Sequence, residues 1–128
     1  MGRYAFFTTG FEYKFRFGVQ HSSDILCFGG FDCGDPDPST GHYLIGWNQS
    51  DMKKMEESLK DLELNLDIKP IDSSSYPLNL QGTYALCHDL YELYSIYKPE
   101  ETVAQYILGR IIHHQLLYAK ELSAHYEA

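Results

Sequence analysis

The stretch FEYKFRF at residues 11–17 decides the fold class of this sequence. Aromatic and charged side chains alternate along it, so the rings share one face and the charges share the other. An alternation with a period of two residues is typical of a β-strand that is buried on one face. The stretch therefore predicts a strand whose aromatic face packs against other elements of the protein.

Other stretches of the chain also carry strand signals. Residues 3–8 precede the first stretch through a possible tight turn at Thr9-Gly10, and a short apolar run and a further alternating run follow it. A change to period two after residue 62 predicts another strand that ends at Pro70. The additional strands are expected at residues 3–8, 25–28, 42–47 and 62–69.

Three segments show the spacing of helices. In the first, Met52, Met55 and Leu59 recur at intervals of three and four residues. The others are predicted at 83–97 and 99–125, and Pro99 is expected to end one and open the next. The order is ββββαβαα. It predicts one α+β domain over residues 1–128, with a mixed, largely antiparallel sheet of four to five strands packed against three helices.

The last predicted helix has apolar residues on more sides than one modest sheet needs. A helix of this kind is either central to the core or shared with a second subunit. We expect the second, with a homodimer as the simplest partner arrangement. The predicted interface residues come from the last two helices: Tyr84, Tyr91, Tyr106, His114, Leu116 and Leu117.

The composition narrows the class of partner and the compartment. The 128 residues carry a net charge of −8 and contain no run of Lys or Arg, which argues against nucleic acid and anionic membranes as partners. The three cysteines have no disulfide or zinc spacing, and no apolar run approaches the length of a membrane span. We expect a cytoplasmic protein without a cofactor.

One loop, at residues 32–42, offers an alternative function. Cys33 is a candidate nucleophile with His42 as its base, and three carboxylates nearby are candidate metal ligands: Asp32, Asp35 and Asp37. The acids raise the pKa expected for the thiol, and their spacing does not follow a calcium-loop pattern. The leading hypothesis is therefore a non-enzymatic interaction or assembly domain that self-associates through its C-terminal helices. A small hydrolase, transferase or metal-dependent protein is the alternative.

Overall fold

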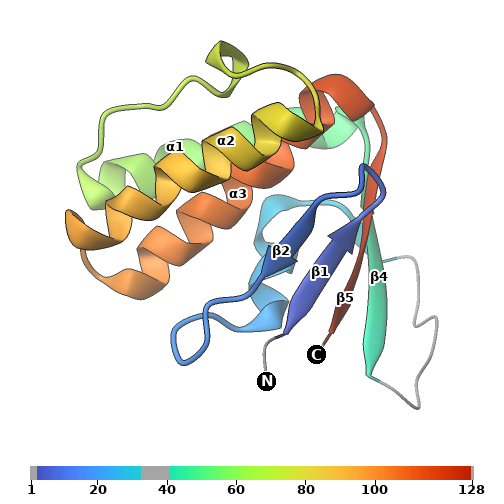
Figure 1. Ribbon diagram of the computed structural model, residues 1–128, viewed down its shortest axis with the longest axis horizontal. Coiled ribbons are helices and arrows are strands. Elements are labelled where there is room, and N and C mark those ends of the chain that lie inside the picture. The colour runs from blue at the N-terminus through green and yellow to red at the C-terminus, as the bar shows by residue number, and fades with distance from the viewer. Residues whose placement is uncertain (1–2, 33–40, 128) are drawn as a thin grey trace.

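The computed structural model describes residues 3–32 and 41–127, which fold into a sheet covered by helices on one face (Figure 1). The strand order is β2-β1-β5-β4-β3, and every pair of neighbours is antiparallel. The strands are β1 (Tyr4–Phe7), β2 (Glu12–Lys14), β3 (Phe31–Asp32), β4 (His42–Trp47) and β5 (Leu122–Glu127). The predicted α+β class is thus confirmed.

The helical layer has α3 at its centre. This helix packs against α1, α2 and the sheet, so the core lies around it (Figure 1). The α-helices are α1 (Met52–Leu66), α2 (Leu80–Leu90) and α3 (Glu100–Ala119). Short 3-10 helices join them and the strands: η1 (Ser22–Phe28), η2 (Gln49–Asp51), η3 (Ser73–Ser75) and η4 (Tyr91–Ser95).

The alternation that decided the fold class is confirmed as far as Phe15. Phe11, Tyr13 and Phe15 are buried beneath the helices, whereas Glu12 and Lys14 between them are exposed. The pattern fails at the next aromatic residue because the chain turns there. As a result the predicted long strand is reduced to β2 and its two flanking residues.

The order of elements differs from the prediction in the second half of the chain. Residues 62–66 continue α1, which ends where Asp67 takes a left-handed conformation with φ of 55°. The remaining strand is β5, which was predicted as part of the last helix. Lys120, with φ of 66°, ends α3 and lets the chain return between β1 and β4. The observed order is therefore ββββαααβ.

The expected strand at residues 25–28 is instead the end of η1. Ile25 and Phe28 are both fully buried, and their spacing of three residues puts them on one side of a 3-10 helix. A short apolar run can serve either structure, because its length alone does not distinguish them.

Candidate functional site

Helix α3 lies inside its own chain, which corrects half of the predicted interface. Tyr106, His114 and Leu116 are each 0% exposed, and Leu117 is only partly exposed. The surrounding helices and sheet cover the apolar sides that we assigned to a second subunit. A partner could therefore reach Tyr106, His114 and Leu116 only if this protein unfolded.

The polar groups of α3 bond within the chain on the side facing α1. The Tyr106 hydroxyl donates to the Glu63 carboxylate at 2.6 Å, and the Arg110 guanidinium forms a salt bridge with the same carboxylate. Arg110 also donates to Ser73 in η3 at 3.3 Å. Burial, followed by the hydrogen bond to Glu63, raises the pKa of Tyr106 to about 12. This cluster ties α1 and the 70–76 segment to α3.

A second polar cluster joins α3 to the start of α2. The His114 ring lies 2.8 Å from the Thr83 hydroxyl and 3.0 Å from the Pro77 carbonyl oxygen. The neighbouring His113 is 8% exposed, and neither of its ring nitrogens has a hydrogen-bond partner. Burial lowers the pKa of both histidines. The contacts of His114 hold the segment before α2 and the start of that helix against the core.

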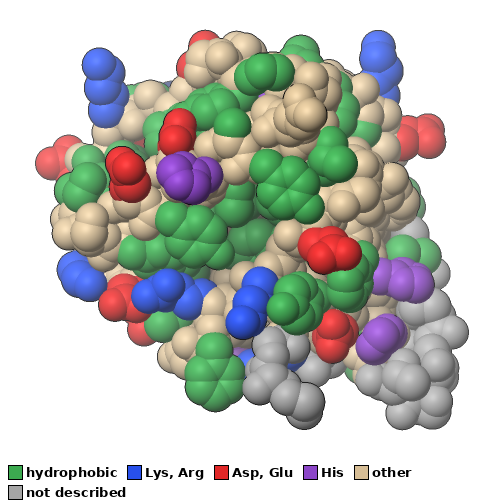
Figure 2. Space-filling view, viewed as in Figure 1, with side chains coloured by type: hydrophobic (Ala, Val, Ile, Leu, Met, Phe, Trp, Pro, Cys, Tyr) green, Lys and Arg blue, Asp and Glu red, His purple; other side chains and the backbone are tan. Residues whose placement is uncertain are grey.

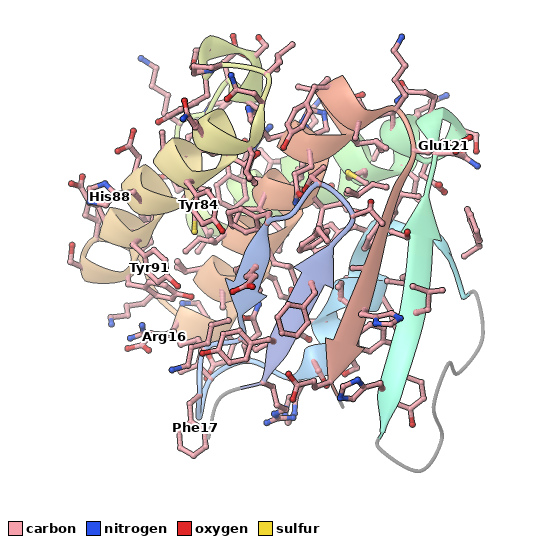
Figure 3. All side chains as sticks on the ribbon, turned by 45° about the vertical axis from the view of Figure 1, so that its right-hand side comes forward. Arg16, Phe17, Tyr84, His88, Tyr91 and Glu121 are labelled. Atoms are coloured by element: carbon pink, nitrogen blue, oxygen red, sulfur yellow. The ribbon has the colours of Figure 1, made fainter. Side chains whose placement is uncertain are left out.

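The other two predicted interface residues are at the surface and face β2. Tyr84 is 47% exposed and Tyr91 is 45% exposed. In Figure 3 both side chains extend from α2 and its continuation η4 toward β2. The ring of Tyr84 lies 4.6 Å from that of the buried Phe11, centroid to centroid, so Tyr84 packs against the core where the helix meets the strand.

We call this region the tyrosine face and define it by its exposed and partly exposed residues, which are Tyr84, Cys87, Tyr91 and Tyr94. Figure 2 shows hydrophobic side chains gathered on this side of the molecule, with charged groups around them. Tyr91 and Tyr94 have ring centroids 5.8 Å apart. The face is therefore a largely aromatic surface on α2 and η4, on the side toward β2, and it is only partly covered by its own chain.

Charged groups border the tyrosine face at the end where Tyr94 lies. The Arg16 guanidinium lies 4.1 Å from the centroid of the Tyr94 ring and 3.6 Å from the Glu100 carboxylate. A depression here is lined by Arg16, Glu100, Tyr91 and Phe17, and the last of these is 80% exposed. Sequence reasoning missed Arg16 and Phe17. Gly18, which follows the last ring of the alternation, was the available signal that the strand ends there.

The alternative site falls mostly outside the described residues, which do not include Cys33, Asp35 or Asp37. Asp32 ends β3 and His42 opens β4, where it pairs in register with Glu127. Within residues 3–32 and 41–127, no group of three or more His, Cys, Asp or Glu side chains is placed to hold a metal ion.

The two cysteines in the described part of the chain do not have activated thiols. Burial raises the pKa of Cys87 to about 11. Burial and the nearby Asp24 carboxylate raise the pKa of Cys27, although this residue is exposed. A thiol with a raised pKa holds less of the reactive thiolate at neutral pH.

Comparisons with protein-family models, with curated proteins and with solved structures give no match to this chain. Among the helices that the structure describes, none is both long enough and apolar enough to cross a membrane.

Proposed function

We propose that this protein is a non-enzymatic protein-binding or assembly domain that uses the tyrosine face, with self-association as its simplest mode. The observation that carries the proposal is the pair of half-exposed tyrosines on α2 and η4, one of which packs against Phe11 beside β2. Tyrosine offers a large ring and a hydroxyl on a side chain with few rotatable bonds, and for this reason it is enriched at protein interfaces.

The location of this surface changes the earlier hypothesis in one respect. The sequence placed the interface on both of the last two helices, and burial of α3 leaves α2 and η4 as its support. We also propose a cytoplasmic location. Cys27 and Cys87 are both free thiols, which is usual for proteins in a reducing compartment.

Sedimentation velocity on the full chain, from low to high micromolar concentration, tests the proposal. We expect the wild type to assemble and the double variant Tyr84→Ser/Tyr91→Ser to assemble about tenfold more weakly, as expected for loss of two interface anchors. Leu64→Ser is the matched control, because Leu64 is 71% exposed on α1, outside the tyrosine face. A wild type that remains monomeric at every concentration would contradict self-association.

A further inference from the structure

The outer edge of β2 carries backbone groups that point away from the sheet. Phe11 accepts a hydrogen bond from the N–H of Phe7 at 2.9 Å, and Phe15 donates to the chain before β1 at 2.9 Å. These two bonds fix which residues of β2 face β1. In an antiparallel ladder the alternate residues direct their N–H and C=O groups to the opposite side. Glu12 and Lys14 therefore present these groups at the free edge.

The free edge is short because the chain closes it at both ends. The Arg16 N–H donates to the Gln20 side chain at 3.1 Å, and the Arg16 carbonyl accepts from the Val19 and Gln20 N–H groups. At the other end the Gly10 N–H donates back to the carbonyl of the last residue of β1 at 2.9 Å. Between these two ends, the edge can pair with another strand through the two N–H and two C=O groups of residues 12 and 14.

We propose that a second copy of the chain adds to this edge, β2 against β2 in antiparallel, so that two sheets become one. This inference rests on the self-association proposed above and gives it a geometry. In the register that places Tyr13 opposite Tyr13 of the second copy, Glu12 lies opposite Lys14 and Lys14 lies opposite Glu12. Every outward N–H and C=O group of residues 12 and 14 then has a partner across the dyad.

The edge is complementary to itself in charge only in this register. Glu12 and Lys14 lie on the same exposed face of the strand, so each carboxylate would face an ammonium group of the second copy. A shift of the dyad to residue 12 places Glu12 opposite Glu12. A shift of the dyad to residue 14 places Lys14 opposite Lys14. It would also require pairing by the backbone groups of Arg16, which already form hydrogen bonds within their own chain.

The same arrangement also covers the tyrosine face. All the helices lie on one side of the sheet, and α2 lies near its β2 end, as the contact of Tyr84 with Phe11 shows (Figure 1). Extension of the sheet through β2 places the α2 helices of both copies on the same face of the joined sheet, one on each side of the dyad. Tyr84 and Tyr91 would then pack against their equivalents in the second copy, next to the paired strands.

Charge reversal tests this pairing by sedimentation velocity. We expect Glu12→Lys and Lys14→Glu each to weaken self-association about tenfold or more, because each variant creates two oppositions of like charge across the dyad. The double variant Glu12→Lys/Lys14→Glu should associate like the wild type. An equimolar mixture of the two single variants should also recover association, because each lysine then faces a glutamate of the other chain.

Net charge is controlled within the experiment. One single variant makes the chain less acidic and the other makes it more acidic, so a general charge effect would move them in opposite directions. Lys60→Glu on the exposed side of α1 is a further control with the same charge change as Lys14→Glu. Circular dichroism of each variant checks that the fold is retained.

The outcomes separate this inference from the function on which it rests. If Tyr84→Ser/Tyr91→Ser weakens association but both charge variants assemble like the wild type, edge pairing is wrong and the tyrosine face keeps its function. A mixture that stays unassociated also overturns the pairing. If the wild type does not self-associate, both proposals of self-association fail together.

Discussion

Helices α2 and α3 pack against each other and both are rich in apolar residues, but they have opposite places in the molecule. In α3, twelve residues are buried, including His113, His114 and Gln115. In α2 only Gly82, Thr83, Leu86 and Leu90 are buried. The apolar circumference of a helix therefore reports how many elements of its own chain surround it, whereas exposed aromatic residues such as Tyr84 show where that cover ends.

The largest expected difference between the two helices concerns stability. Arg110→Ala on α3 leaves the buried Glu63 carboxylate without its cation, and removal of one partner of such a pair costs about 3–5 kcal/mol. Tyr91→Ser on the α2 side should change the free energy of unfolding by less than about 1 kcal/mol, because that ring is already half exposed. Urea unfolding monitored by circular dichroism measures both.

A further variant shows whether the cost of Arg110→Ala is electrostatic. The triple variant Glu63→Met/Arg110→Met/Tyr106→Phe removes both charges together with the buried hydroxyl that bonds to them and keeps much of the side-chain volume, so it should recover most of the lost stability. If Arg110→Ala and Tyr91→Ser lower the unfolding free energy equally, the contrast drawn between α3 and α2 is wrong.

The second test adds one methyl group to the interior of α3. A Cβ atom on Gly109 would lie 2.5 Å from the Phe28 ring and 2.8 Å from Leu59, so Gly109→Ala should destabilise the protein by about 1–3 kcal/mol through overpacking. Helix propensity alone predicts the opposite sign, since Ala stabilises a helix interior by about 1 kcal/mol relative to Gly.

The matched change on α2 is Ala85→Gly, at an exposed position. There the loss of a methyl group should cost about 1 kcal/mol, because propensity acts without a packing constraint. Thermal unfolding measures both variants, and each is expected to unfold at a lower temperature than the wild type, so Gly is preferred at position 109 and Ala at position 85. A Gly109→Ala variant that is more stable than the wild type would show that Phe28 and Leu59 leave room for a methyl group on α3.

The sequence predicted those parts of the fold that depend on local periodicity. The alternation through Phe15 and the helical spacing of Met55 and Leu59 were sufficient, because each pattern buries one face of its own element. Residues 62–66 also alternate, but Glu63 is buried against Arg110 on a distant helix, and that contact has no local signal. Continuing the helix there satisfies the ion pair, which a strand would not.

The last strand could have been predicted and was not. Leu122, Ala124 and Tyr126 are buried in alternation on one face of β5, a pattern visible in the sequence. The prediction extended the helical spacing of apolar residues past Lys120, where the structure shows that the spacing changes from helical to a period of two residues. The free edge of β2, in contrast, depends on β5 inserting beside β1, and strand order of this kind is set by long-range pairing. The sequence could therefore single out Tyr84 and Tyr91, which are exposed in the structure, but it could not show that β2 is the edge strand beside them.

The smallest expected effect is the pH dependence of stability, which separates the buried histidines of α3 from the exposed histidine of α2. Burial, followed by the charge of Arg110, lowers the pKa of His113 below its ordinary value of 6.5. The unfolded chain therefore binds a proton that the folded chain resists. The free energy of unfolding should be fully retained above pH 6.5 and should fall as the pH decreases below it, by at most about 1.4 kcal/mol per pH unit for each such histidine.

Urea unfolding at several pH values between 5 and 7.5 measures this slope. His113→Leu should reduce it, and because neither nitrogen of His113 has a hydrogen-bond partner, the substitution removes no bond. His88→Gln on α2 is the control, since the His88 side chain is 86% exposed. A slope that His113→Leu leaves unchanged while His88→Gln reduces it would reverse the contrast between the two helices, because proton uptake would then be linked to folding on the exposed helix.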